Sequence, residues 1–311
     1  MHDLNIVSHA PAHRWSTPAT RPVSREDARA FSAGIGRLAV RSLYAELALY
    51  PKPGLVSLVD NGSHDDMAAA TFIRSLFALR GYFIRIAAAG MEAAPFATLK
   101  RLGMEAEQRM LLATGGINTH RGAIFCLGLL CAAIGNCRAQ GIALSATAIR
   151  DTLLSRWGTS LAAHTQPGTA EFKTDSTADS HGLQVARRYA ASGAREEAAL
   201  GLPSVFDMAL PALQRTLAAG RGWRKARVDA LFTLMGHIHD TNVYHRGGEQ
   251  GALTVRRHAR EFLDCGGTAH PDWEDRAKAC HCLFVAARLS PGGAADLLAA
   301  ACLVHEATRS R

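Results

Sequence analysis

The sequence predicts an all-α protein, and two observations lead to this conclusion. Ala and Leu dominate while aromatic residues make up only 6% of the 311 residues, and this composition favours helix over sheet. Apolar residues recur at helical spacing, and no convincing run alternates apolar with polar residues as a half-buried strand does. We predict one globular domain of about ten helices over residues 25–311, after a flexible tail over residues 1–24.

The first predicted helix begins at Ser24, a good N-cap with Asp27 at the capping-box position. It ends before Pro51 and Pro53, which cannot continue a helix. Glu46 lies one residue away from its apolar face, so it is either a boundary salt bridge or an acid of a functional site. The expected apolar face is Phe31, Ile35, Leu38, Ser42, Ala45 and Leu49.

A turn-rich loop over residues 51–64 leads to a second predicted helix. Asp65 and Asp66 are expected to open it, because acidic side chains suit the positive end of the helix dipole. Capping alone explains at least one of these acids, whereas their position beside His64 favours a functional role. The core face is expected at Phe72, Leu76, Leu79 and Phe83.

The next three helices follow from stop and start signals. The third is predicted over about 98–113, because Gly115 and Gly116 form a helix-stop signal. A fourth begins near Thr119, and Ser145 is expected to cap a fifth.

The second half of the chain continues the helical pattern. Residues 165–182 are polar and too long for a plain connector, so this stretch is either a functional loop or disordered. A break at residues 290–293 precedes a last helix over about 294–307. Five helical segments are predicted in between, near 183–198, 204–219, 224–240, 249–264 and 272–289.

A polar signature occurs twice, as Thr-Gly-Gly-Ile-Asn-Thr-His-Arg-Gly over residues 114–122 and Asp-Thr-Asn-Val-Tyr-His-Arg-Gly-Gly over residues 240–248. Arg suits phosphate, His moves a proton near neutral pH, and glycine lets the backbone approach a ligand. Free N–H groups at a helix start also attract anions. We therefore expect binding roles for Asn118, Arg121, Asp240, Asn242, His245 and Arg246, with His120 beside them.

A third polar cluster runs from Pro51-Lys52-Pro53-Gly54 to residues 61–67. Lys52 sits on a stiff loop, where it is either a phosphate contact or a solvated turn residue. The three clusters together predict a site for a polyanion and a metal ion.

Composition excludes several other classes. The net charge of +8 suits anionic ligands, although a solvated basic surface accounts for most arginines. We expect no nucleic-acid partner, because there is no long basic run and no nucleic-acid motif. Seven Cys without a Cys-x-x-Cys, no secretory signal and no span of about 18 apolar residues indicate a cytoplasmic protein outside the membrane. There is also no P-loop and no Rossmann fingerprint, so a bound nucleotide would occupy a non-standard site.

Taken together, these segments resemble the triphosphoribosyl-dephospho-CoA synthases, all-helical enzymes that make the prosthetic-group precursor of citrate lyase and malonate decarboxylase. The resemblance runs from about residue 37 to 303, with Arg121 where Lys is expected and Ser57-Leu58-Val59-Asp60 in place of a more polar run. The matching blocks are Glu46, residues 51–56, 62–67, 114–125, 193–198, 201–203, 240–242, 246–248 and 290–298.

The resemblance implies that the 2′-hydroxyl of 3′-dephospho-CoA attacks the anomeric carbon of ATP, and that adenine leaves. A separate holo-acyl-carrier-protein transferase would take the product. A freestanding chain with no fused transferase favours the malonate decarboxylase branch. The implied roles are Mg²⁺ binding or stabilisation of the sugar cation for Asp65, Asp66 and Glu46, phosphate contacts for Lys52, Arg121 and Arg246, proton transfer for His120 or His64, and sugar contacts for Asn118 and Asn242.

Two other readings remain open. An all-helical enzyme similar to ADP-ribosyl hydrolases would deliver water to the anomeric carbon instead, but such proteins usually show more acid pairs. A non-catalytic partner that binds CoA or a nucleotide would leave Asp65 and Asp66 without a role.

Overall fold

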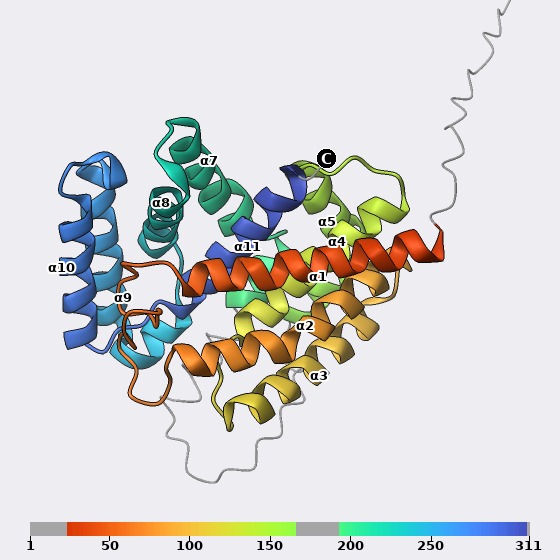
Figure 1. Ribbon diagram of the computed structural model, residues 1–311, viewed down its shortest axis with the longest axis horizontal. Coiled ribbons are helices and arrows are strands. Elements are labelled where there is room, and N and C mark those ends of the chain that lie inside the picture. The colour runs from red at the N-terminus through yellow and green to blue at the C-terminus, as the bar shows by residue number, and fades with distance from the viewer. Residues whose placement is uncertain (1–23, 166–192, 310–311) are drawn as a thin grey trace, which may run out of the picture.

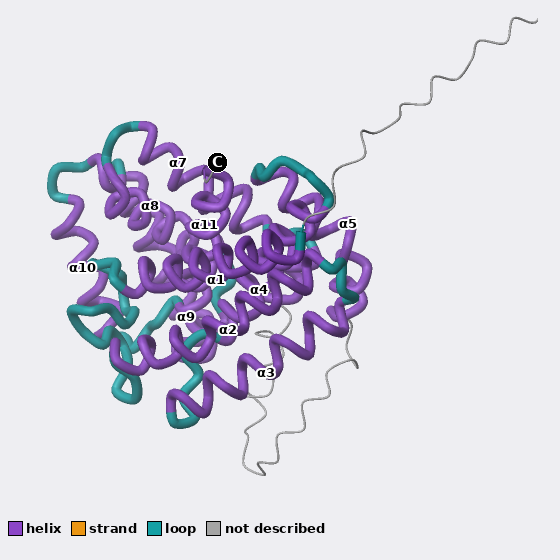
Figure 2. Tube along the Cα trace, turned by 45° about the vertical axis from the view of Figure 1, so that its right-hand side comes forward, coloured by secondary structure: helices purple, strands orange, loops and turns teal. Residues whose placement is uncertain are grey.

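The computed structural model describes residues 24–165 and 193–309 (Figure 1). Every long element in these two ranges is a helix and neither range contains a strand, which confirms the predicted all-α class (Figure 2). Almost all of the predicted tail and of the predicted loop over 165–182 lies outside the described residues. The same holds for most of the helix expected over 183–198, whose described part, residues 193–198, is helical.

The helices follow in the order that the sequence predicts. Helix α4 lies at the centre, packed against α1, α2, α3, α5 and α11. The bounds are α1 Arg25–Leu47, α2 Ala69–Met91, α3 Phe96–Thr114, α4 Arg121–Ala139, α5 Ala146–Thr165, a π-helical turn Ser204–Ala209, α7 Leu210–Ala218, α8 Gly222–His237, α9 Thr241–Asp264, a 3-10 turn Gly267–Ala269, α10 Trp273–Ala286 and α11 Gly292–Arg309.

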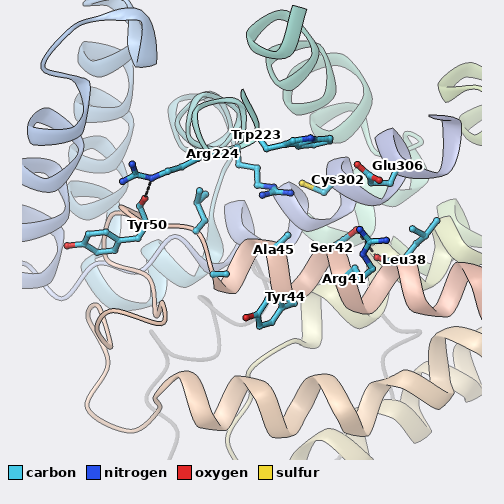
Figure 3. A pocket seen from close by; sticks show the side chains of 13 residues that line it. Leu38, Arg41, Ser42, Tyr44, Ala45, Tyr50, Trp223, Arg224, Cys302 and Glu306 are labelled. Atoms are coloured by element: carbon cyan, nitrogen blue, oxygen red, sulfur yellow. Dashed lines mark hydrogen bonds between the residues drawn. The ribbon is translucent and has the colours of Figure 1, made fainter. Parts of the chain in front are cut away.

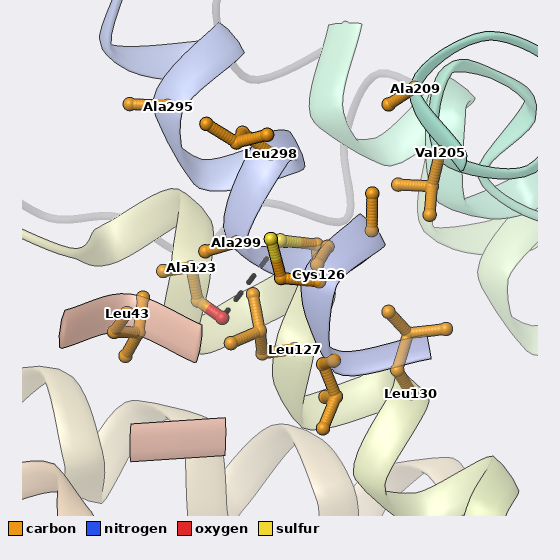
Figure 4. Close-up of a cluster of buried hydrophobic side chains, with 14 of the residues drawn as sticks. Leu43, Ala123, Cys126, Leu127, Leu130, Val205, Ala209, Ala295, Leu298 and Ala299 are labelled. Carbon is orange, nitrogen blue, oxygen red and sulfur yellow. Dashed lines mark hydrogen bonds between the residues drawn. The ribbon is translucent and has the colours of Figure 1, made fainter. Parts of the chain in front are cut away.

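Helix α4 is apolar on all sides because it is enclosed on all sides. Among the described residues it is the one helix that is long and apolar enough to cross a membrane. However, 78% of its apolar 18-residue stretch is buried inside the molecule. Figure 4 shows side chains of α4 meeting those of α1, α11 and the π-helical turn, among them Leu43, Leu127, Val205 and Leu298. A core helix of this kind explains the apolar run without any lipid.

Close contact between α2 and α4 depends on small residues. A Cβ atom on Gly90 would overlap the carbonyl of Ala132, and one on Gly128 would overlap the hydroxyl of Tyr82. The Tyr82 hydroxyl donates to the carbonyl of Ile124 at 2.8 Å. The two helices therefore pack with their backbones nearly in contact.

The start of α1 is confirmed, but its buried face is shifted from the prediction. The Ser24 hydroxyl accepts the backbone N–H of Asp27 at 3.0 Å. Helix α1 packs against both α2 and α11, so the face between these two helices is the one that is buried. That face includes Ile35, Ala39, Ser42, Leu43, Glu46 and Leu47, whereas Phe31, Leu38 and Ala45 are only partly buried.

The predicted start of the second helix is wrong. Helix α2 begins at Ala69, and Asp65 and Asp66 lie in a bend before it. The chain ahead of α2 is held by distant partners, since the Ser63 hydroxyl donates to the Leu289 carbonyl at 2.6 Å. Acidic side chains at the positive end of the helix dipole therefore do not determine where α2 begins. Of the four predicted core residues, Leu76, Leu79 and Phe83 are buried as expected, whereas Phe72 is only partly buried.

The other boundaries follow the sequence closely. Helix α3 ends at Thr114 with Gly115 in the left-handed region at φ 70°. The Ser145 hydroxyl accepts the backbone N–H of Ala148 at 3.1 Å, as expected of a cap for α5.

Candidate active site

Several of the predicted site residues lie where helices begin and where α1 ends. The loop between α1 and α2 lies beside the start of α9 (Figure 1), joined by a hydrogen bond from Arg246 Nη1 to the Ser63 carbonyl at 2.9 Å. The start of α11 contacts the start of α9 through Asp240 and the start of α4 through Asp296.

Asp240 links two helix starts. It is the N-cap of α9, where its Oδ1 accepts the backbone N–H of Asn242 at 3.0 Å. Its Oδ2 accepts the backbone N–H of Ala294, in the first turn of α11, at 2.9 Å. Burial raises the pKa of the Asp240 carboxyl to about 6, against the opposing effect of these N–H groups. The buried carboxyl thus orients α9 and α11 relative to each other.

Asp296 is a site residue that sequence reasoning missed. It is the fifth residue of α11, and its carboxylate occupies the space that a side chain at position 122 would need. The backbone N–H of Ala123 donates to it. Burial, and then the negative charges of Glu46 and Asp240, raise the pKa of Asp296 well above its usual range. The available signal was an acid three residues after the Ser-Pro-Gly-Gly break, which we interpreted only as a helix boundary.

Lys52 and Glu46 form a buried ion pair, with Nζ 2.5 Å from Oε1. The two residues are only 1% and 4% exposed, so neither is a solvated surface group. Burial lowers the pKa of Lys52, although Glu46 and Asp60 oppose that shift. His281 supports the loop, since its Nδ1 lies 3.0 Å from the Lys52 carbonyl and its Nε2 3.3 Å from Asp60.

His120 is buried at the N-cap of α4 and has one nitrogen without a partner. Its Nδ1 lies 2.7 Å from the Ser75 hydroxyl, and its ring packs edge-on against Phe72. Nε2 is buried with no hydrogen-bond partner, as is the nearby hydroxyl of Thr119. Burial, followed by the charge of Lys52, lowers the pKa of His120 to about 3. His120 is therefore neutral at pH 7, with a polar atom left for a ligand or a water molecule.

His64 connects the loop before α2 to α9 and α11. Its Nδ1 lies 2.9 Å from Arg246 Nη2, and its Nε2 lies 2.8 Å from the Ser290 hydroxyl. Because a guanidinium only donates, Nδ1 accepts and Nε2 carries the proton. Burial and the charge of Arg246 lower the pKa of His64, while Asp66 opposes that shift. Neutral His64 thus joins the polar cluster over residues 51–67 to the polar signature over residues 240–248.

The remaining predicted binding residues lie on the surface. Asn118 caps α4, because its Oδ1 accepts the backbone N–H of Arg121 at 3.1 Å. The Arg121 side chain pairs with Glu107 at 2.6 Å. Asn242 and His245 are exposed in the first turns of α9. All four residues are exposed to solvent.

The second polar signature lies between the helices predicted near 224–240 and 249–264, but most of it is helical. Residues 241–247 are helical, and α9 continues after a kink at Gly248, which has φ 58° and ψ −156°. The Asp240 cap starts the helix early, because its carboxylate satisfies the backbone N–H of Asn242.

The three predicted metal ligands do not form one site. Across residues 24–165 and 193–309, no group of three or more His, Cys, Asp and Glu side chains is placed to hold a metal ion. The Asp65 and Asp66 side chains are 88% and 61% exposed, whereas Glu46 is buried against Lys52. Asp65 lies 3.4 Å from Arg288 and Asp66 lies 3.5 Å from His64, so the two exposed carboxylates have different partners.

A separate groove, with a volume of about 750 Å³, opens between α1, α8 and α11 (Figure 3). None of the predicted site residues lines it. Arg227 lies over the Trp223 ring at 4.9 Å, and Arg224 donates to the Tyr50 carbonyl at 2.9 Å. Tyr50 connects the groove to the cluster, because it directly precedes the turn that carries Lys52.

Comparison with known proteins identifies relatives of the whole described region. Residues 32–311 match the family model described as ATP:dephospho-CoA triphosphoribosyl transferase. The chain is 36% identical over 309 residues to a protein of Vibrio cholerae serotype O1, which covers 97% of this chain and 95% of that protein. It is 39% identical over 261 residues to a protein of Acinetobacter calcoaceticus, which covers 84% and 86%.

A protein of Pseudomonas fluorescens is 40% identical over 279 residues, covering 88% of this chain and 91% of its own length. All three relatives carry the name probable 2-(5′′-triphosphoribosyl)-3′-dephosphocoenzyme-A synthase. No solved structure matches the chain.

Proposed function

Because the chain belongs to the ATP:dephospho-CoA triphosphoribosyl transferase family, we propose that it transfers the 5-triphosphoribosyl group of ATP to the 2′-hydroxyl of 3′-dephospho-CoA and releases adenine. One observation carries the proposal: the family pattern spans residues 32–311 and includes every block whose polar groups meet at the helix starts. Enzymes of this class are transferases, and this chain is one of them.

The chemistry of the cluster supports this reaction. A triphosphate requires cationic donors, and the exposed Arg246 offers a guanidinium group beside His64. Loss of adenine leaves positive charge at the anomeric carbon, which nearby carboxylates stabilise. Neutral His64 and His120 are suited to hydrogen bonding and orientation, because their lowered pKa values keep them uncharged at pH 7.

We also propose that Asp65 and Asp66 hold the Mg²⁺ ion that accompanies the triphosphate. The ion would neutralise phosphate charge and fix the chain of phosphates in the site. The support is their exposure at the edge of the cluster and the affinity of carboxylate oxygens for Mg²⁺.

The biological destination of the product is a finer proposal. We propose the acyl carrier subunit of malonate decarboxylase, reached through a separate holo-acyl-carrier-protein transferase, rather than that of citrate lyase. We place the enzyme in the cytoplasm, since all seven cysteines are free thiols. Incubating the purified product with each carrier and its transferase, and weighing the carriers by mass spectrometry, would decide the branch.

Adenine release tests the reaction itself. Purified protein is mixed with ATP, Mg²⁺ and 3′-dephospho-CoA, and the mixture is separated by chromatography with mass detection. Equal amounts of adenine and of a triphosphoribosylated dephospho-CoA are expected. Adenine without the adduct would indicate a hydrolase, and binding of either substrate without adenine would indicate a non-catalytic partner.

A further inference from the structure

We propose that the groove between α1, α8 and α11 binds the pyrophosphate and the pantetheine arm of 3′-dephospho-CoA. The inference rests on the proposed function and gives its second substrate a binding site. The groove has a volume of about 750 Å³, which lies within the usual range for pockets that hold small organic ligands. Its shape, its charge and its position each favour this occupant.

The groove is long because its floor follows α1. Leu38, Ala45 and Leu49 line it from this helix, and their spacing places them on one side of α1. From Leu38 to Leu49 the helix rises about 16 Å, at about 1.5 Å a residue. Figure 3 shows Leu38 and Tyr50 at opposite ends. A single phosphate would fill little of this length, whereas an extended arm with apolar and amide groups would cover it.

Positive charge dominates the groove. Of the described residues that line it, Arg41, Arg224 and Arg227 are basic and only Glu306 is acidic. A groove with an excess of one charge raises the local concentration of ligands of the opposite charge. The pyrophosphate of dephospho-CoA is such a group, and arginine is the side chain best suited to phosphate oxygens.

Two of these arginines have donors that no protein group uses. Arg41 is exposed and forms no hydrogen bond or ion pair within residues 24–165 and 193–309. The guanidinium of Arg227 lies over the Trp223 ring, and its Nε is buried without a hydrogen-bond partner. Buried N–H groups are nearly always paired in folded proteins. A ligand oxygen or a water molecule in the groove therefore completes the contacts of Arg227.

One end of the groove reaches the candidate active site. Tyr50 lines the groove and lies two residues before Lys52. Cys302 lines it from α11 and is near the buried Glu46. Burial, and after it nearby carboxylates that include Glu46, raise the pKa of the Cys302 thiol to about 11. A ligand in the groove thus lies next to the segment that carries the Lys52–Glu46 pair.

This position sets the direction of the bound substrate. The ribose with its reacting 2′-hydroxyl lies at the Tyr50 end, because the candidate active site adjoins that end. Arg224 donates to the Tyr50 carbonyl at 2.9 Å, and Arg227 lies about one helical turn further along α8. The pyrophosphate, which is joined to the same ribose, therefore faces Arg227. The pantetheine arm runs along α1 towards Leu38, where Arg41 is left to donate to its amide carbonyls.

The test measures binding by calorimetry with the full chain, using 3′-dephospho-CoA and ATP as separate ligands. Arg227→Gln removes a charge from the groove, and Ala48→Trp fills the groove from an exposed position in its lining. Each variant should raise the Kd for dephospho-CoA about ten- to a hundredfold, the effect of losing a hydrogen bond to a charged group or comparable packing. The Kd for ATP should stay unchanged.

Two further measurements follow from the same expectation. In adenine release, the KM for dephospho-CoA should rise in both variants while the KM for ATP does not. The fragment 4′-phosphopantetheine has the arm and a phosphate but no adenosine, so it should compete with dephospho-CoA and not with ATP.

Arg85→Gln provides the matched control. Arg85 is a half-buried arginine of α2 whose Nε is also buried without a partner, and it does not line the groove. This variant loses the same charge and should keep both Kd values. If Arg227→Gln does not fold, Ala48→Trp decides alone, since its new side chain starts from an exposed position.

The outcomes separate the inference from the proposed function. Wild-type Kd and KM values for dephospho-CoA in a folded Ala48→Trp variant would overturn the inference, as would a rise for ATP in place of dephospho-CoA. Loss of binding to an acyl carrier or its transferase in the same variants, with dephospho-CoA unaffected, would assign the groove to a protein partner and also overturn it. If the wild-type protein binds dephospho-CoA in the groove but releases no adenine, the proposed function alone is wrong.

Discussion

Oδ2 of Asp240 accepts the backbone N–H of Ala294 at 2.9 Å, so a residue that precedes α9 caps the start of α11. Asp296, two residues further along α11, in turn accepts the backbone N–H of Ala123 in α4. The starts of three helices are thus joined in series by two carboxyl groups. The geometry of the candidate site depends on these contacts between helices that are far apart in the sequence.

Asp240 predicts a dependence of stability on pH. Its folded-state pKa of about 6 lies above the ordinary value of 3.8, so the folded protein binds more protons between these values. Its contribution to the free energy of unfolding is therefore present below about pH 4 and lost as pH rises through 6, by at most about 3 kcal/mol.

Urea unfolding of the wild-type protein and of Asp240→Asn between pH 4 and 7 checks this expectation. The variant loses one good acceptor, and we expect it to be about 1–2 kcal/mol less stable at pH 5. We also expect a flatter pH dependence in the variant. An equal slope in both proteins would contradict the assignment of that titration to Asp240.

The Lys52–Glu46 pair predicts strong coupling between two substitutions. Removing one partner leaves the other charge buried, so Lys52→Met and Glu46→Gln should each lower the free energy of unfolding by about 3–5 kcal/mol. The double variant should recover much of that loss, because no unpaired charge remains. Denaturant unfolding of the four proteins gives the interaction energy, and simple additivity would show that the pair is not coupled.

Local signals in the sequence predicted most of the helices. Ser24 and Ser145 cap their helices, and Gly115 ends α3, because each acts on backbone groups only a few residues away. The start of α2 was not predictable in this way. The Ser63 hydroxyl bonds Leu289, 226 residues away, and that contact decides the path of the chain.

The candidate site could likewise be predicted only in part, because some of its contacts join residues that are far apart in the sequence. The sequence identified His64, His120 and Asp240 from their polar context. His64 and Asp240 contact other polar segments, whereas His120 contacts Ser75 of α2. The sequence did not decide whether Glu46 forms a boundary salt bridge or is an acid of the site. The buried side of α1 depends on where α2 and α11 pack. Asp296 resembled an ordinary acid near the start of a helix, and only its contact with Gly122 marks it as unusual.

The exposed acids predict the metal dependence of the reaction. If Asp65 and Asp66 hold Mg²⁺ with the triphosphate, EDTA should abolish adenine release, and excess Mg²⁺ should restore it. Asp66→Asn should raise the Mg²⁺ concentration needed for half-maximal rate about tenfold, which corresponds to ~1.4 kcal/mol. Helix content measured by circular dichroism should stay unchanged. An unaltered Mg²⁺ dependence in that variant would remove Asp66 from the metal site.

The contact between Gly122 and Asp296 predicts that the site does not tolerate a side chain at position 122. A Cβ atom at this position would overlap the Asp296 carboxylate, so Gly122→Ala must displace either that side chain or the start of α4. We expect a loss of about 1–3 kcal/mol in the free energy of unfolding, as for other overpacked positions. Adenine release should fall more sharply, because both Asp296 and His120 flank the displaced backbone.

Gly81 provides the matched control. It lies in the middle of α2 and is exposed, and a Cβ atom added to it would meet nothing within 4 Å. Gly81→Ala should therefore stabilise the protein by up to about 1 kcal/mol, since alanine favours helix, and should leave adenine release intact. If the two variants behaved alike in both unfolding and adenine release, the contact between Gly122 and Asp296 would not govern the site. A loss confined to Gly122→Ala would tie activity to the place where α4 and α11 meet.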